Sequence, residues 1–185
     1  MSIFKTSAVL LKINQIKESE FLLDVFSYDY GKIKLKIKKS KSQKSLDLWF
    51  IINFEINTKK EDDIHQIKNI KIKNEFDYVN KNYEIIIEYL ELLSIINEKC
   101  PLNMPIYEIF NILNELHNFK NITPEKIIFA KLKIFAILWI LNTQNKNEKI
   151  KKILFFISKE NIKNILKLKW LNEEEKNILK NILIK

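Results

Sequence analysis

The chain of 185 residues contains no arginine, one cysteine, one glycine and three prolines. The single cysteine, Cys100, excludes an internal disulfide. With two histidines, His65 and His117, it is too small a set for a Cys/His zinc site, so we expect no metal and no other cofactor. One glycine excludes both glycine-rich phosphate loops and the nucleophile elbow. We therefore expect a protein that is not an enzyme.

Long apolar runs are also missing. The longest uninterrupted run, Ile134 to Leu141, is far shorter than the ~20 residues of a membrane-spanning helix. The apolar stretch at the N-terminus contains lysines and lacks the small-residue cleavage pattern of a signal peptide. We expect a cytoplasmic protein with no membrane partner.

The chain is rich in lysine, and its net charge is +9 at pH 7. Such a balance favours partners that carry phosphates or other anions. The charge is concentrated between Gly31 and Leu46, where there is no acid. The seven lysines of this stretch are Lys32, Lys34, Lys36, Lys38, Lys39, Lys41 and Lys44.

The first ~75 residues have the two-residue period of β-strands. The runs that we expect to form strands are 3–13, 20–28, 32–38, 48–57 and 64–73. The only glycine, Gly31, lies between the second and third runs, where a tight hairpin needs a positive φ. Five short strands predict an OB-fold-like β-barrel over residues 1–75.

From residue 78 the apolar pattern becomes helical. The ranges that we expect to form helices are 80–98, 105–119, 124–141, 148–157, 159–168 and 173–184. Thr123 and Pro124 are a typical helix start, with Thr123 as a hydroxyl N-cap. The helix that follows is apolar nearly all round and should be the centre of a bundle. The fold class is therefore α+β, with a barrel over 1–75 and a helical domain over 78–185.

The lysine-rich strand allows two interpretations. Lys32, Lys34, Lys36 and Lys38 alternate with apolar residues, so they share one face, and Lys39, Lys41 and Lys44 continue into the next loop. A row of like charges is destabilising unless something compensates, and a nucleic acid would do so. The outer face of strands two and three is also where OB-folds bind oligonucleotides. The alternative is a face that is merely solvated.

Two aromatic residues on the second strand could add base stacking. If Asp24 faces outward, Phe26 and Tyr28 do so too, and bases could stack on them while lysines hold phosphates. The alternative for Phe26 is the barrel core. Because lysine lacks the planar fork of arginine, we expect backbone contacts with little sequence preference.

The same residues resemble a known family. Ala8-Val9-Leu10, Glu18-Ser19-Glu20, the hairpin Ser27-Tyr28-Asp29-Tyr30-Gly31 and the basic strand after it are similar to the barrel of bacterial RecO. Further similar segments are 83–96, Pro105 to Phe110 and Phe129 to Phe135. Where many members carry a four-cysteine zinc segment, this chain has Asn142 to Lys146.

The resemblance implies a recombination mediator without zinc. Such a protein binds single- and double-stranded DNA, promotes strand annealing and helps load the recombinase. Its implied partners are RecR and the tail of single-strand DNA-binding protein. Two alternatives remain open: an OB-fold RNA-binding factor associated with transfer RNA or the ribosome, and a protein-interaction scaffold with an incidental lysine face.

Overall fold

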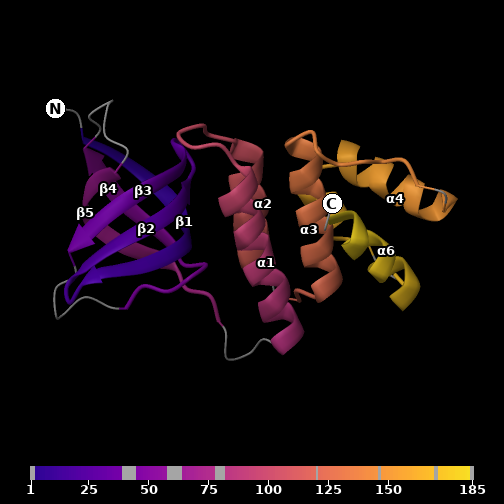
Figure 1. Ribbon diagram of the computed structural model, residues 1–185, viewed down its shortest axis with the longest axis horizontal. Coiled ribbons are helices and arrows are strands. Elements are labelled where there is room, and N and C mark those ends of the chain that lie inside the picture. The colour runs from indigo at the N-terminus through magenta and orange to yellow at the C-terminus, as the bar shows by residue number, and fades with distance from the viewer. Residues whose placement is uncertain are drawn as a thin grey trace. The chain divides into compact units, whose positions relative to one another are not determined.

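The computed structural model describes residues 3–38, 45–57, 64–77, 82–119, 121–145, 147–168 and 171–183. Along these residues five strands precede six helices (Figure 1). The chain divides into two compact units, each of which combines two segments of sequence. The first unit is Met1–Val79 with Ile96–Phe110, and the second is Asn80–Ile95 with Asn111–Lys185.

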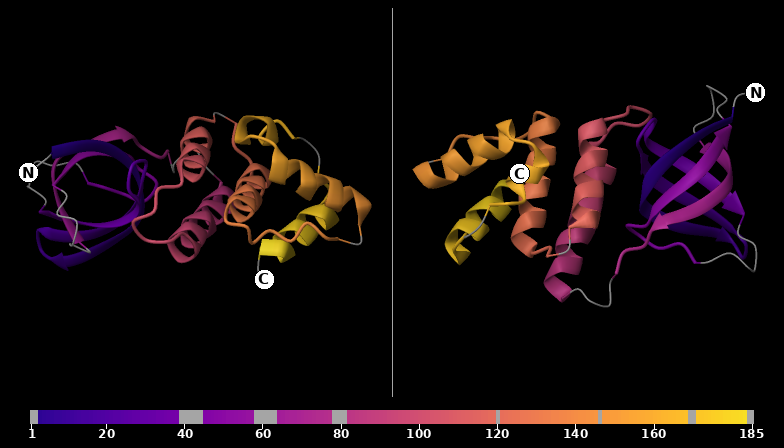
Figure 2. Two further views of the ribbon diagram at one scale, coloured as in Figure 1. Left: turned by 90° about the horizontal axis from the view of Figure 1, so that it is seen from above. Right: turned by 180° about the vertical axis from the view of Figure 1, so that it is seen from behind.

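The first unit contains a closed five-stranded barrel, as predicted. Its strands are β1 (Ile3–Lys17), β2 (Glu20–Ser27), β3 (Gly31–Lys38), β4 (Ile51–Asn57) and β5 (Ile64–Asn74). They close in the order β1-β2-β3-β5-β4, and β1 pairs with β4 to complete the ring (Figure 2). Neighbours are antiparallel except β3 and β5, which are parallel over a short stretch.

Strand β1 is longer than the sequence predicts because it serves two neighbours. Its first half pairs with β4 and its second half with β2. The register shifts between Leu10 and Lys12, which is the signature of a bulge, and a bulge bends a strand and increases its twist. One bent strand can therefore belong to both sides of a small barrel.

The hairpin between β2 and β3 depends on Gly31. Its φ is 69°, a left-handed conformation that only glycine adopts without steric cost, so this prediction is confirmed. The structure adds a second reason for glycine. A Cβ atom here would collide with the backbone oxygen of Met104, and close by the Asn103 amide donates to the Lys32 carbonyl over 2.9 Å.

The helices start and stop close to the predicted positions. They are α1 (Tyr83–Lys99), α2 (Tyr107–Asn118), α3 (Pro124–Ile137), α4 (Glu148–Lys159), α5 (Ile162–Ile165) and α6 (Glu173–Leu183). In the second unit α3 contacts α4, α5 and α6, and most of its residues are buried. The prediction of a central apolar helix is thus confirmed. None of the described helices has both the length and the apolar character of a membrane span.

Two details of α3 differ from prediction. The helix ends at Ile137 rather than 141, because Trp139 turns left-handed with φ 60° and the Ile140 amide bonds back to the Phe135 carbonyl. Such a reversal closes many helices. Thr123 occupies the N-cap position, but its side chain makes no capping hydrogen bond. Side-chain caps come instead from Asn147 on α4 and Asn161 on α5.

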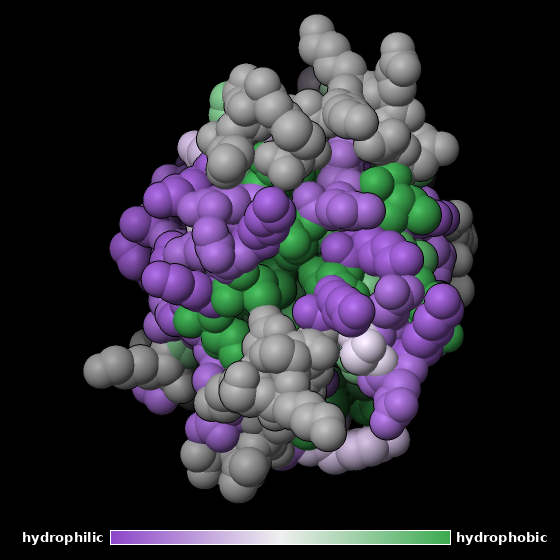
Figure 3. All heavy atoms as spheres, turned by 90° about the vertical axis from the view of Figure 1, so that its left-hand side faces the viewer, coloured by the Kyte–Doolittle hydropathy of each residue, from purple (hydrophilic) through white to green (hydrophobic). Residues whose placement is uncertain are grey.

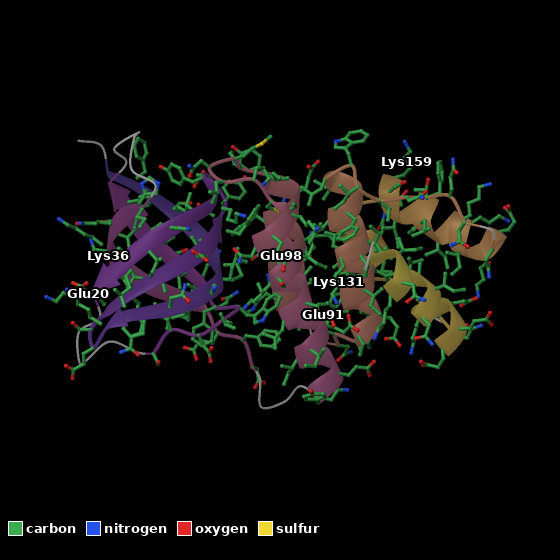
Figure 4. All side chains as sticks on the ribbon, viewed as in Figure 1. Glu20, Lys36, Glu91, Glu98, Lys131 and Lys159 are labelled. Carbon is green, nitrogen blue, oxygen red and sulfur yellow. The ribbon has the colours of Figure 1, made fainter. Side chains whose placement is uncertain are left out.

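A buried ion cluster joins three helices of the second unit. Lys131 on α3 is 1% exposed and bonds Glu88 and Glu91 of α1 over 2.5 and 2.6 Å. The other oxygen of Glu88 pairs with Lys180 of α6 over 2.6 Å. Figure 4 shows Lys131 and Glu91 facing each other. A buried charge is tolerated when it is paired and hydrogen-bonded in this way.

Candidate nucleic-acid interface

The lysine-bearing strand β3 has one apolar and one charged face, as its alternation predicts. Ile33, Leu35 and Ile37 are buried in the barrel. Among the lysines, Lys34 and Lys38 are exposed, and Lys32 and Lys36 are half-buried. Lys39, Lys41 and Lys44, which we also expected to bind nucleic acid, lie outside the described residues. Figure 3, which views the first unit from the left of Figure 1, shows hydrophilic side chains bordering an apolar area.

The outer face of the neighbouring strand β2 carries acids that face these lysines. In register, Glu20 lies opposite Lys38 and Asp24 opposite Lys34, and residues directly opposite each other share a face. The Glu20 carboxylate pairs with Lys36 over 3.1 Å (Figure 4). This hydrogen bond and the charge of Lys36 lower the pKa of Glu20. Part of the lysine repulsion is therefore relieved within the barrel.

Two features at the hairpin end of this face correct our expectation for Phe26. The ring is fully buried, so the prediction that Phe26 faces solvent beside the lysines is wrong. Its partner in register is Lys32, whose ammonium group donates to the Asn97 carbonyl over 2.6 Å. The face that holds Phe26 and Lys32 is thus covered by the segment Ile96–Phe110 of the same unit.

Tyr28 remains partly accessible in the hairpin turn, with 41% of its surface exposed. Its ring centroid lies 4.9 Å from that of Tyr107 and 5.4 Å from that of Phe110. Tyr107 is half-exposed as well. Sequence reasoning missed Tyr107 because nothing in a helical segment 79 residues away indicates contact with a hairpin. The pair presents aromatic surface of the kind on which bases stack.

The groups that could support catalysis or metal binding are dispersed. Burial raises the pKa of the Cys100 thiol to about 11, which keeps it from forming the reactive thiolate at neutral pH. Within the described part of the chain, no three His, Cys, Asp or Glu side chains come together in a way that could hold a metal ion.

A second surface of interest lies on α4. A groove of about 480 Å³ is lined there by both aromatic and charged side chains. Phe155 is 60% exposed, and the ammonium group of Lys159 lies 5.9 Å from its ring centroid. Lys151 and Lys152 also border the groove. This arrangement offers an apolar contact bordered by three lysines and by Glu148 and Glu160.

Comparison with known families was decisive for the barrel. Residues 1–76 match the family model described as Recombination protein O N terminal. The barrel is similar to the N-terminal domain of RecO. The resemblance that we read from the barrel residues is confirmed, and the matched domain is an OB-fold. No curated protein matches the chain. This match of the barrel supports a role in DNA recombination and repair.

Proposed function

We propose that this RecO-like chain is a non-enzymatic mediator that binds single- and double-stranded DNA and anneals complementary strands. It acts with a RecR-like partner and helps load the recombinase in the cytoplasm. The barrel supplies the DNA-binding surface and the helical part supplies protein contacts. The observation that carries the proposal is the exposure of Lys34 and Lys38 on the outer face of β3, in a barrel of the RecO type.

The electrostatics of this face favour a phosphate backbone. Lys34 and Lys38 lie four residues apart on one strand and share its outer face, so they can contact phosphates along one track. Lys36 is held by Glu20, but a surface ion pair is weak, and a phosphate can take over that ammonium group. Tyr28 and Tyr107 stand at the hairpin end of the same strand, where unpaired bases can stack.

The test replaces both exposed lysines, as Lys34→Gln with Lys38→Gln. We expect single-stranded DNA to bind about ten-fold more weakly at 0.1 M salt, since two phosphate contacts are lost, with the same loss for every sequence. The matched control is Lys151→Gln with Lys152→Gln, which removes equal charge from two exposed lysines of α4. It should stay within about two-fold. If both variants lost the same DNA affinity, binding would depend on the net charge of the protein alone, and a specific site on β3 would be refuted. Competition with an RNA oligonucleotide of the same sequence decides between DNA and RNA.

The groove on α4 is the surface that we assign to the tail of single-strand DNA-binding protein. Its exposed Phe155 and surrounding lysines suit a segment that is acidic and partly apolar. Phe155→Ala should weaken binding of a synthetic tail peptide by about ten-fold in titration calorimetry, the scale of losing a buried aromatic contact. DNA affinity should not change. Tyr83→Ala, which removes another exposed aromatic ring, is the control. Co-purification tests the RecR-like partner.

A further inference from the structure

The barrel carries a second polar surface on its outer face, around β4. A groove of about 610 Å³ is formed there by side chains of β1, β4 and β5. In the ring order β1-β2-β3-β5-β4, strand β4 touches neither β2 nor β3. None of the residues that line the groove belongs to β3, so its lining does not include the lysines of that strand. Besides the buried Thr6, the polar residues that line it are Lys5, Ser7, Asn53, Glu55, Asn69 and Lys71.

The polar groups of the groove are held in place by one another. Ser7 donates its hydroxyl to the Asn53 side-chain oxygen over 2.6 Å. The Asn69 amide donates to Glu55 over 2.6 Å, and the second Glu55 oxygen lies 3.6 Å from the Lys5 ammonium group. Within the described residues the side-chain nitrogen of Asn53, Nδ2, has no hydrogen-bond partner. It can therefore donate to a ligand. A fixed arrangement of this kind lowers the entropy lost on binding.

A bulge in β5 brings Asn69 to this position. Asn53 pairs with Lys71 and Glu55 with Lys68, so two residues of β5 oppose the single residue between them on β4. Asn69 has φ 50°, which asparagine tolerates better than most side chains. Bulges often re-aim a side chain beside a binding site. Here the re-aimed amide reaches Glu55 at the groove.

The chemistry of the groove fits the edges of nucleobases. Asparagine amides pair with adenine, and a carboxylate accepts from the amino group of cytosine. Lys5, whose side chain is 83% exposed, and Lys71, also exposed, stand where phosphates of the same strand would pass. We propose that this groove is a second nucleic-acid site, which takes the bases of a single strand. The inference rests on the proposed function, in which the first strand lies on β3.

The consequence is that one barrel holds two strands. A strand on β3 and another in the groove of β4 are bound to the same small domain, which raises their effective concentration toward each other. Annealing then needs both surfaces, whereas binding of a single strand needs only one. This difference separates the two sites experimentally.

The experiment counts oligo-dC molecules per chain by native mass spectrometry and measures annealing of complementary strands by fluorescence. The wild type should bind two oligonucleotides. The variant Asn53→Ala with Lys71→Gln should bind the second about ten-fold more weakly and anneal about ten-fold more slowly, with the first strand unaffected. Lys71→Gln alone, which leaves the Ser7–Asn53 bond intact, should give a smaller effect of the same sign. The control Lys73→Gln removes an exposed lysine of the same strand outside the groove and should stay within about two-fold of the wild type.

The outcomes separate the two proposals. The double variant must first unfold thermally like the wild type. If it then binds two strands and anneals at the wild-type rate, the proposed groove site is refuted, while the proposed DNA binding on β3 still stands. A wild type that binds one strand only would also overturn it. Failure of every variant and of the wild type to bind oligo-dC would refute the proposed function itself. Loss of the first strand alone in Lys34→Gln with Lys38→Gln would support both sites.

Discussion

Lysine has different partners in the two compact units. In the second unit several lysines pair with glutamates of other helices or turns. The pairs are Lys131 with Glu88 and Glu91, Lys149 with Glu175, Lys151 with Glu148, Lys163 with Glu115, Lys176 with Glu125 and Glu173, and Lys180 with Glu88. On the outer face of β3, Lys36 is paired with Glu20 while Lys34 and Lys38 stay exposed. The net charge therefore matters less than where the chain leaves lysines open to an anion.

The largest expected effect is a loss of stability on replacing the buried Lys131. Lys131→Met removes the buried ammonium group and leaves Glu88 with Lys180 as its remaining partner. We expect a loss of about 3 kcal/mol in the free energy of unfolding, because the buried Glu88 carboxylate loses the partner of one of its two oxygens. Lys34→Met on the exposed face should change it by less than about 0.5 kcal/mol. Urea denaturation measures both. If the two variants lost similar free energies of unfolding, the distinction between paired lysines in the second unit and open lysines on β3 would be wrong.

A slightly smaller effect concerns the hairpin that presents the lysine strand. Gly31→Ala forces a side chain into a left-handed conformation and against the Met104 backbone. We expect a loss of about 2 kcal/mol or more in the free energy of unfolding, counting the left-handed conformation alone at about 1–2 kcal/mol. Ser45→Ala, an exposed position before β4, serves as the control. An unchanged midpoint of thermal unfolding in Gly31→Ala would show that the hairpin is built differently.

A third prediction sharpens the description of the DNA-binding face. Glu20→Gln releases Lys36 and removes a negative charge beside it. DNA should bind about three-fold more tightly, the scale of a surface ion pair. Glu18→Gln, an exposed acid in the adjacent turn, should change the affinity by less than about 1.5-fold. If Glu20→Gln weakened binding in fluorescence anisotropy, Lys36 would have a structural rather than a ligand-binding role.

The smallest effect is a pH dependence in the second unit. Glu175 accepts from Lys149 and from the Asn172 amide, and these bonds lower its pKa. Because the folded-state pKa is depressed, the stabilisation exists above the unfolded value and is lost as pH falls through the folded one. Between pH 5 and 3 the free energy of unfolding should therefore fall less steeply in Glu175→Gln than in the wild type. Parallel curves in acid titration of stability would exclude this role for Glu175.

These comparisons show which features could be read from the sequence. Alternation placed the lysines of β3 on one face, and the isolated Gly31 identified the hairpin, because both are properties of neighbouring residues. Contacts between residues that are far apart in the sequence could not be predicted in this way. Glu20 compensates Lys36 from another strand, so a stretch without acids is not a surface without acids.

The burial of Phe26 and the contact of Tyr107 with the hairpin could not be predicted for the same reason. The face of Phe26 is covered by a segment from about 70 residues further along the chain, and period alone cannot show what covers a strand. The polar groove around β4 depends on a bulge at Asn69. Bulges shift the register by one residue and break the alternation on which strand prediction relies.

The central claim is that lysines on β3 bind the phosphate backbone, and the salt dependence of DNA binding tests it most directly. If four or five lysines of the stretch Lys32 to Lys44 engage single-stranded DNA, log K should fall against log salt with a slope of about −3. In Lys34→Gln with Lys38→Gln the slope should flatten by about 1.4, since each contact contributes about 0.7. An unchanged affinity and slope in that variant would contradict the claim and leave the lysine face merely solvated.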